Sequence, residues 1–344
     1  MSAPEAIAEG DAALIALARK LADRAGRGRM LGIARLAGGR NNRVYRLEIE
    51  NGSPLVMKRY FSDPRDTRDR LGAEWNFVRH AWSRGIRTIP EPLVSDASER
   101  AGLYGFVQGR KLSAPEVTQA HLDAAIDFVL AINERPRPAL VAASEACFSI
   151  GQHIAVIERR LARLAAIDPA VPNAKEAQHL VSARLFPAWN AVKRFLAAEA
   201  PAEDRTLDPE ECCLSPSDFG FHNALLDGEG HLTFLDFEYA GLDDPAKLVS
   251  DFFCQPEVSV PLACHAYFVD RLAKGLRLDA AAIARCRMLL NAYRIKWTCI
   301  ILNDFVPLDS ARRAFANEAD RAIRCADQLA KANLKMTEIE ASIP

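Results

Sequence analysis

The sequence lacks the features that mark membrane proteins, secreted proteins and nucleic-acid-binding proteins. Across 344 residues no apolar run approaches the ~18 residues that span a bilayer. No secretory signal is evident, and no internal repeat or low-complexity tract occurs. A formal net charge of -1 gives no electrostatic reason to expect nucleic acid or an acidic membrane surface as a partner. We therefore expect a cytoplasmic protein that binds neither nucleic acid nor a membrane.

Paired cysteines and clustered histidines are also missing. The eight cysteines include no C-x-x-C pair, and the seven histidines are scattered without ligand spacing. We expect reduced thiols, with adjacent Cys212 and Cys213 as small core residues, and no structural zinc. What the chain does have is 49% apolar and 26% charged residues, the balance of a globular protein with a sizeable core. Its length favours two lobes or two domains.

The most informative stretch runs from Ser215 to Asp244. Asp218 and Asn223 precede an apolar run, a D-G-E-G turn and a second apolar run that ends at Asp236, which predicts a short β-hairpin. Such a hairpin would bring the loop before it close to the strand end after it, so that Asp218, Asn223 and Asp236 converge. Two carboxylates and an amide oxygen form the hard-oxygen donor set that Mg²⁺ takes when phosphate oxygens and water complete its shell.

This arrangement resembles the catalytic and metal loops of the kinase fold. The run L-D-F-E-Y-A-G followed by D-D-P is similar to the I-D-W-E…G-D-P run of the aminoglycoside phosphotransferase and choline kinase family. The resemblance implies that Asp218 accepts the proton of the acceptor hydroxyl and that Asn223 and Asp236 hold Mg²⁺. Pro216-Ser217 stand where that family usually has His-Gly. This departure motivates the alternative of a nucleotide-binding pseudokinase with a regulatory or scaffolding role.

The N-terminal part carries a hairpin of the same family type. Residues Gly38 to Asn42 have the sequence G-G-R-N-N and lead into an alternating strand, an Asn51-Gly52 turn and a returning strand. The hairpin resembles the glycine-rich nucleotide hairpin of the kinase fold, in the version found in aminoglycoside phosphotransferases. The resemblance implies nucleotide contacts for Gly39, Asn41 and Asn42.

Lys58 lies in the returning strand, among apolar residues. A buried ammonium is costly unless it meets an anion, and a phosphate of ATP supplies one. A helix is expected over 68–84, with Asp63-Pro64 as its cap and Gly85 at its end. It carries Glu74, and the resemblance implies that Glu74 orients Lys58 on the nucleotide phosphates.

Two further strands are expected after this helix, and the second ends at a segment that matches the hinge between kinase lobes. The resemblance implies that backbone groups near Phe106 and Val107 bind the adenine edge. We place the boundary there, which gives an N-terminal nucleotide-binding lobe (1–107) and a C-terminal catalytic and substrate lobe (108–344). The expected fold class is α+β, a two-lobed protein-kinase-like fold with an antiparallel-sheet N-lobe and a mostly helical C-lobe.

Helical spacing dominates after the hinge, beginning with a capping box that Ser113 opens. No activation segment follows Asp236, which disfavours a protein substrate. An apolar helix expected over 279–302 carries two cations and an indole, which have to lie in solvent or in a cleft. We expect this helix to line the acceptor pocket, whose acceptor would then carry an anionic group; alternatively, the cations reach the surface and the indole packs in the core. The candidate acceptor residues are Glu238, Arg294, Lys296 and Trp297.

The ordered set of Lys58, Glu74, Asp218, Asn223 and Asp236 is far less expected by chance than any one of its members. The sequence therefore predicts an enzyme, an ATP- or GTP-dependent phosphotransferase that uses Mg²⁺. It would transfer the γ-phosphoryl group in line to a hydroxyl of a small molecule. A sugar, an aminosugar, an amino alcohol or a nucleoside would each be a suitable acceptor.

Overall fold

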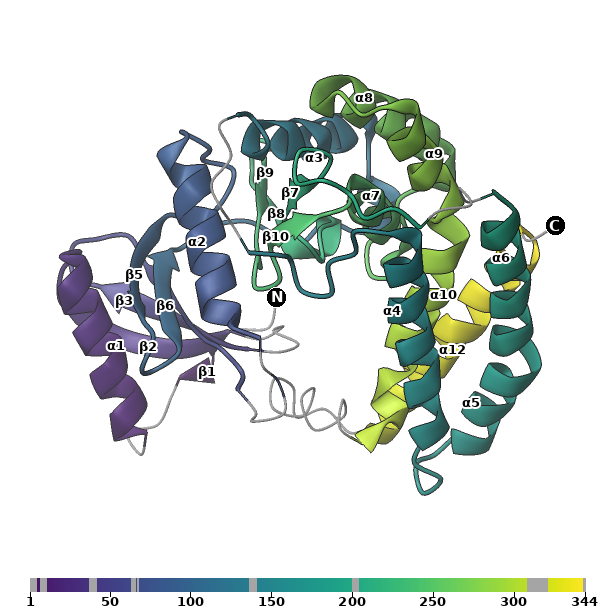
Figure 1. The fold of residues 1–344 in the computed structure, drawn as a ribbon. Helices are drawn as coiled ribbons and strands as arrows, with labels where there is room; N and C mark the ends of the chain where they lie inside the picture. The colour runs from purple at the N-terminus through teal and green to yellow at the C-terminus, as the bar shows by residue number, and fades with distance from the viewer. Residues whose placement is uncertain are drawn as a thin grey trace.

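The computed structural model describes residues 5–6, 11–36, 42–62, 66, 68–135, 141–199, 204–307 and 321–342, with an antiparallel sheet at one end and helices at the other (Figure 1). The expected α+β arrangement is present, because strands dominate before the hinge segment and helices dominate after it. One hydrophobic core lies between α1 and the sheet, and a larger one extends through the helical part.

The N-terminal part is an antiparallel sheet with the strand order β1-β2-β3-β4-β6-β5. Its elements are β1 (Glu5–Ala6), α1 (Ala12–Ala25), β2 (Met30–Leu36), β3 (Arg43–Ile49), β4 (Leu55–Arg59), α2 (Arg70–Ser83), β5 (Pro92–Asp96) and β6 (Ala101–Gly105). The strands predicted on either side of the Asn51-Gly52 turn are confirmed as β3 and β4. Asn51 has the positive φ, 56°, that a tight turn of this kind requires.

One face of the sheet is covered by α1. The alternation predicted for β3 is confirmed, since Tyr45, Leu47 and Ile49 are buried. Leu17 and Leu21 of α1 belong to the same hydrophobic core as these strand residues. The alternating buried residues of β3 and the apolar stripe of α1 therefore pack in one interface.

β2 is a strand that the sequence pattern does not predict. Its residues, M-L-G-I-A-R-L, do not alternate between apolar and polar, and most of them are half-buried. The strand forms as the antiparallel partner of β3, with Ile33 opposite Leu47. β2 pairs with the open edge of β3, and this pairing satisfies the peptide groups of both strands. The sheet is therefore extended by a segment in which no local pattern indicates a strand.

The helix expected over 68–84 is present as α2, but its start differs from the expectation. Asp69 is the N-cap, and its carboxylate accepts the N–H of Gly72 at 2.9 Å. Asp63-Pro64, the expected cap, lies outside the described residues. Gly85 follows the helix with φ 82°, the left-handed conformation in which glycine commonly ends a helix.

The C-terminal part consists of helices around two small two-stranded sheets, in which β7 pairs with β10 and β8 pairs with β9. The strands are β7 (Cys213–Ser215), β8 (Ala224–Leu226), β9 (Leu232–Phe234) and β10 (Gly241–Asp243). The α-helices are α3 (Gln119–Ile132), α4 (Ile150–Arg163), α5 (Ala174–Leu180), α6 (Phe186–Glu199), α7 (Pro245–Cys254), α8 (His265–Leu276), α9 (Ala280–Met288), α10 (Leu290–Ile301) and α12 (Arg321–Glu340). The hairpin predicted before Asp236 is confirmed as β8 and β9.

Two helices of this part differ from the sequence expectation. The capping box at Ser113 is present, but it opens only a short 3₁₀ turn (Ala114–Glu116), and α3 begins afterwards with Thr118 as its own cap. The helix expected over 279–302 is divided into α9 and α10, which meet at Leu289. In both cases the segment is helical, as its apolar spacing predicts. A local change of backbone angles determines where each helix begins or ends.

Stacked phenylalanines connect α2 with the helical part. Figure 1 shows α2 between the sheet and the helices. Phe77 of α2 stacks on Phe237 with ring centroids 4.6 Å apart, and Phe128 of α3 stacks on Phe234 at 4.8 Å. Phe219 lies 5.0 Å from Phe234. Because buried aromatic pairs add about 0.5–1.5 kcal/mol each to the area that they bury, α2 is held firmly on the segments around β8 and β9.

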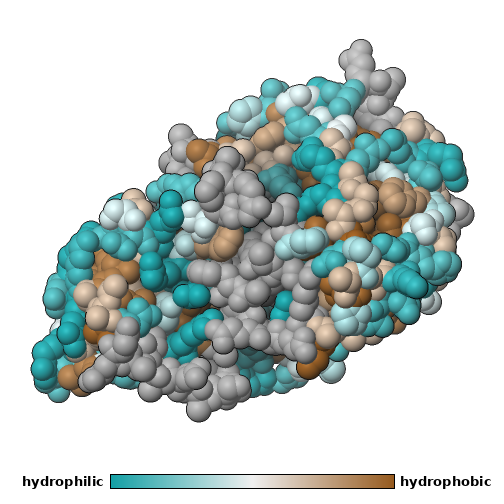
Figure 2. Space-filling model, turned by 90° about the horizontal axis from the view of Figure 1, so that it is seen from below, coloured by the Kyte–Doolittle hydropathy of each residue, from teal (hydrophilic) through white to brown (hydrophobic). Residues whose placement is uncertain are grey.

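Hydrophobic and hydrophilic residues are interspersed on the described surface (Figure 2), and most of the cysteines are buried. On the part of the face in Figure 2 that the structure describes, hydrophobic residues form small groups separated by hydrophilic ones. Among the described helices, none has the length and apolar character needed to cross a bilayer. All eight cysteines are free thiols, and both Cys212 and Cys213 are buried.

Candidate active site

The centre of the candidate site is the ammonium group of Lys58 on β4. Its Nζ lies 2.6 Å from Glu74 of α2 and 2.5 Å from Asp236, the second residue after β9. Tyr60 Oη also donates to Glu74, at 2.9 Å. The expected ion pair between Lys58 and Glu74 is therefore present, and the structure adds Asp236 to it. Only 10% of the Lys58 side chain is exposed, so two carboxylates take the place of water around the ammonium.

The charges around Lys58 do not balance. Burial alone would disfavour the ammonium, but Asp236 and Glu74 keep the pKa of Lys58 well above its usual range. Burial, together with the nearby Glu238 and Glu74, raises the pKa of Asp236 to about 6 in spite of Lys58. Lys58 therefore contacts two carboxylates, while Glu238 has Arg70 as its own cation; burial and the neighbouring carboxylates together raise the pKa of Asp236.

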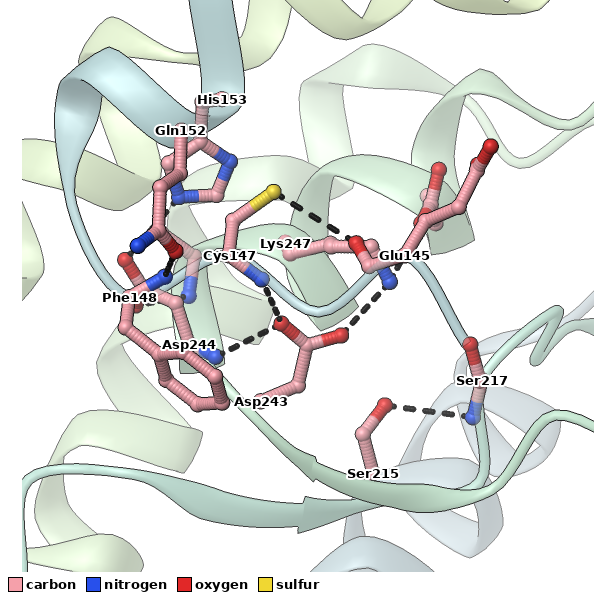
Figure 3. Close-up of polar contacts among 12 residues, drawn as sticks. Glu145, Cys147, Phe148, Gln152, His153, Ser215, Ser217, Asp243, Asp244 and Lys247 are labelled. Atoms are coloured by element: carbon pink, nitrogen blue, oxygen red, sulfur yellow. Dashed lines mark hydrogen bonds and ion pairs between the residues drawn. The ribbon is translucent and has the colours of Figure 1, made fainter. Parts of the chain in front are cut away.

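Asp218 lies in the loop after β7, in a strained backbone conformation. Ser217 and Asp218 have φ values of 50° and 48°, a region in which residues with a side chain cost roughly 1–3 kcal/mol. The N–H of Ser217 donates to Ser215 Oγ at 3.1 Å, and Figure 3 shows the two residues facing each other. Ser217, whose backbone is in the left-handed conformation, stands where the family that the sequence resembles usually has glycine. Ser215 gives the loop a side-chain contact that stabilises this turn.

Asn223 joins the loop of Asp218 to the strand that leads to Asp236. Its Nδ2 donates to the backbone oxygen of Asp218 at 3.1 Å, and its own backbone oxygen accepts the N–H of Leu235 at 2.8 Å. Asp236 then turns out of the strand with φ 66°. The hairpin therefore brings Asp218, Asn223 and Asp236 to one place, as its sequence pattern predicts.

These residues fit a divalent cation that binds together with phosphate. The amide nitrogen of Asn223 is used within the loop, which leaves its oxygen as the possible ligand beside the carboxylate of Asp236. In the described part of the chain, no three His, Cys, Asp or Glu side chains form a metal cage. Mg²⁺ is commonly held by one or two protein oxygens plus substrate phosphates, and the excess of carboxylate around Lys58 favours a cation.

Glu238 is buried at the junction of the two parts of the chain. It accepts Nδ2 of Asn42 at 2.5 Å and Nη1 of Arg70 at 2.8 Å, and only 2% of the residue is exposed. Burial alone would raise the pKa of Glu238, but Lys58 and Arg70 hold it below its usual value. Arg70 also pairs with Asp66 at 2.8 Å. Glu238, expected in the acceptor site, thus binds protein groups on both of its oxygens.

Asn42 is the only one of the expected loop residues that the structure describes; Gly39 and Asn41 lie outside the described residues. Its amide oxygen accepts the N–H of Phe61 at 3.0 Å, so the side chain connects β3, β4 and Glu238. Arg70 was not among the residues that the sequence indicated. The signal for it was its helical spacing, because Arg70 precedes Glu74 by four positions and so lies on the same face of α2.

The hinge segment lies against the hairpin of β8 and β9. Phe106 and Val107 follow β6 and are half-buried, and Arg46 lies over the ring of Phe106 at 4.6 Å. Three residues after Val107, the backbone of Arg110 exchanges hydrogen bonds of 2.9 and 2.8 Å with Leu226. The chain therefore passes from the sheet to the helical part next to the strands that follow Asn223 and lead to Asp236.

The cations of α10 have protein partners. Lys296 donates to both oxygens of Asp251, at 2.8 and 3.0 Å, and Trp297 Nε1 donates to the same carboxylate at 2.7 Å. Arg294 donates to Ser342 beside the end of α12, at 2.7 Å. All three side chains of α10 are buried, so they reach neither solvent nor an open cleft. The expectation that they line an acceptor pocket receives no support from these contacts.

A network of buried charges supports the start of α7, behind the site. Figure 3 shows Asp243 accepting the N–H groups of Cys147 and Asp244, both at 2.9 Å, and the ammonium of Lys247 at 2.6 Å. Nε2 of His153 lies 3.2 Å from Asp244. Burial alone would lower the pKa of His153, but its interactions with Asp244 and Cys147 together raise the value to about 9. The D-D-P run thus fixes β10 and α7 through satisfied buried charges.

Lys296→Met should reduce the stability of the protein without a specific effect on its ligands. Removing one partner of a buried ion pair leaves the other charge uncompensated, which typically costs about 3–5 kcal/mol. Urea unfolding of the variant should show a loss of this size, whereas Lys274→Met, at an exposed position of α8, should change little. A stable Lys296→Met protein would show that Lys247 and Trp297 are sufficient for Asp251.

Asp236→Asn should make the ligand-free protein more stable at neutral pH. The folded protein binds a proton at Asp236 with a pKa of about 6, above the unfolded value, so stability falls as the pH rises from about 4 to 6. An amide has no such penalty. The melting temperature of the variant should exceed that of the wild type by a few degrees at pH 7.5, and the difference should shrink towards pH 4.

Asp227→Asn is the control for this measurement. Hydrogen bonds from the backbone of His231 and Glu229 hold the pKa of Asp227 below its usual value, so this variant should not gain stability. If Asp236→Asn melts below the wild type at pH 7.5, the attraction to Lys58 outweighs the repulsion from Glu74 and Glu238.

Comparisons with known proteins identify the family and the fold of the chain. A family model described as the phosphotransferase enzyme family matches residues 32–253. The search of curated proteins found no match. Similar solved structures include a spectinomycin phosphotransferase in complex with ADP and spectinomycin (TM-score 0.64, 14% identity, 96% of this chain and 98% of that chain). A choline kinase from Cryptosporidium parvum (0.58, 10%, 96% and 96%) and an amicoumacin kinase in complex with AMP-PNP and Ca²⁺ (0.58, 16%, 97% and 94%) are also similar.

At these identities the solved structures establish the fold, and the expected two-lobed, protein-kinase-like fold is confirmed. The family model covers well over half of the chain, so the chain belongs to the phosphotransferase enzyme family.

Proposed function

We propose that the protein transfers the γ-phosphoryl group of ATP to a hydroxyl group of a small molecule, with Mg²⁺ as cofactor. The observation that supports this most strongly is the position of Lys58 between Glu74 and Asp236. An ammonium fixed by two carboxylates beside an Asp-containing loop is suited to position phosphates. ATP is preferred to GTP because two of the similar structures contain ADP and AMP-PNP.

Each residue of the site has one task in this mechanism. Lys58, fixed by Glu74, binds the nucleotide phosphates, while the backbone near Phe106 and Val107 binds the adenine. Asn223 and Asp236 would hold Mg²⁺, which neutralises charge on the phosphate oxygens. Asp218 orients the acceptor hydroxyl and accepts its proton.

The acceptor is a hydroxylated small molecule of the sugar, aminosugar, amino alcohol or nucleoside class. The similar solved structures are a spectinomycin phosphotransferase, a choline kinase and an amicoumacin kinase, which supports a small-molecule acceptor. The contacts of α10 give no reason to expect an anionic group on the acceptor, because Asp251 neutralises the charge of Lys296 and Ser342, beside the end of α12, accepts a hydrogen bond from Arg294.

We also propose that the boundary between the lobes lies between residues 107 and 108. The proposed compartment is the cytoplasm, because eight free thiols are stable there.

The first test separates an enzyme from a pseudokinase without knowledge of the acceptor. A ligand that binds only the folded state raises the melting temperature by mass action. ATP with Mg²⁺ should therefore stabilise the wild type more than ATP with EDTA, and Asp236→Asn should remove the Mg²⁺-dependent part. Equal protection with and without Mg²⁺ would favour the pseudokinase.

The second test concerns catalysis. Hydroxylated compounds of the four classes are screened for Mg²⁺-dependent consumption of ATP, and the acceptor found is then used with Asp218→Asn. Loss of a general base typically lowers kcat by about 10²-fold or more, while thermal protection by ATP should remain. Turnover of Asp218→Asn within a few-fold of the wild type would refute the role of Asp218.

A further inference from the structure

A histidine lies directly beside the proposed base. His222 follows Asp218 by four residues, in the 3₁₀ turn Phe221–Asn223. Its Nε2 is 3.4 Å from Oδ1 of Asp218, and 14% of the histidine side chain and 33% of the aspartate side chain are exposed. Hydrogen bonds of catalytic groups are often long in a ligand-free protein and shorten when substrate binds. This contact is therefore close enough to become a hydrogen bond in the loaded enzyme.

The other ring nitrogen of His222 determines which tautomer is present. Nδ1 is buried and has no hydrogen-bond partner among the described residues. A proton on Nδ1 would be a buried donor without an acceptor, which is the costlier of the two unsatisfied states. The neutral ring therefore carries its proton on Nε2, the nitrogen that faces Asp218.

Gly220 makes room for this ring. Its φ of 166° belongs to extended backbone that any residue adopts, so the backbone does not require glycine here. A Cβ at position 220 would lie 2.9 Å from Nδ1 of His222 and 3.3 Å from Cγ of Gln255. The glycine at position 220 is therefore explained by the imidazole of His222, which packs against the backbone there and leaves no room for a Cβ.

The neighbours of His222 fix the turn. Phe221 is fully buried and lies 5.4 Å from the ring of Phe252, while Asn223 closes the loop on the backbone of Asp218. Lys111, from the segment after the hinge, donates to the backbone oxygen of His222 at 3.4 Å. With both flanking residues held, the imidazole has little freedom to leave Asp218.

We propose that His222 is a positioning residue for the base, and that Gly220 exists to admit its ring. Nε2–H donates to Oδ1 of Asp218 and fixes the carboxylate, so that Oδ2 faces the acceptor hydroxyl. When the new bond from the acceptor oxygen to phosphorus forms and the bond from the γ-phosphorus to ADP breaks, the acceptor proton passes to Oδ2. His222 keeps its own proton throughout. The inference rests on the proposed function of Asp218.

The test compares two replacements of His222 that differ in the donor. Gln places an amide N–H near the position of Nε2, whereas Met fills similar space without a donor. His222→Met should lower kcat about 10-fold or more, the effect of one lost hydrogen bond to a charged group. His222→Gln should stay within a few-fold of the wild type. The KM for ATP should be unchanged in both, because the proposed role of the ring is to hold Asp218 and not to bind the nucleotide.

His231→Met is the matched control. His231 also lies close to an aspartate four residues before it, Asp227, at 3.3 Å, but this pair is on the exposed turn of the hairpin. Its replacement should leave kcat unchanged. If His222→Met and His231→Met behave alike, the histidine beside Asp218 has no role in turnover.

Gly220→Ala provides an independent route to the same effect. Displacing the ring should lower kcat to about the level of His222→Met, and the double variant should fall no further, because both changes remove one contact. Additive losses would show that Gly220 acts through the loop backbone and not through the ring.

The reaction is Mg²⁺-dependent ATP turnover, measured with the acceptor from the screen and also with water alone. Asp218→Asn is included in each series. Equal rates for the wild type and Asp218→Asn would overturn the proposed function itself. A large loss in Asp218→Asn together with an unchanged His222→Met would overturn only the role of His222.

Discussion

The site depends on one ammonium group that is paired from two sides. Lys58 is delivered by the sheet, Glu74 by α2 and Asp236 by the hairpin of the helical part, and the carboxylates lie 2.6 and 2.5 Å away. A lysine that is nine-tenths buried is tolerated only if an anionic partner compensates its charge. The pairing therefore couples three elements that are far apart in the sequence, and the sheet, α2 and the hairpin have to assemble together before the site exists.

Buried phenylalanines place the polar groups of the site. Asp218, His222 and Asp236 each have a phenylalanine as a direct neighbour in the chain, and the three rings belong to the same core. Adjacent residues point in different directions, so fixing each ring in a close-packed core also fixes the direction of the polar side chain beside it. This explains how short loops can hold functional groups in place without regular structure. The neighbouring rings are Phe219, Phe221 and Phe237.

The predictable part of the fold and site is the part encoded locally. The pairing of Lys58 with Glu74 is what the family resemblance implies, whereas the alternation of β3 and the hairpin that ends at Asp236 follow from local patterns. β2 and the partners of Lys296 do not, because a strand edge and the carboxylate of Asp251 become visible only when distant segments meet. The same holds for Glu238, whose contacts with Asn42 and Arg70 cross the junction of the two parts. A charged residue in an apolar helix indicates that a partner exists, but the sequence does not say whether that partner is a ligand or the protein.

The features that weaken this site are the ones that suit it to phosphate chemistry. Ser217, Asp218 and Asp236 have positive φ values, and the pKa of Asp236 is raised by its crowded surroundings. The folded protein tolerates these unfavourable terms because the aromatic core and the buried pairs around Asp243 and Asp244 contribute more stabilisation than the terms remove. Under the proposed function a bound divalent cation supplies countercharge to Asp236, so the ligand-free protein is least balanced where its function requires a partner.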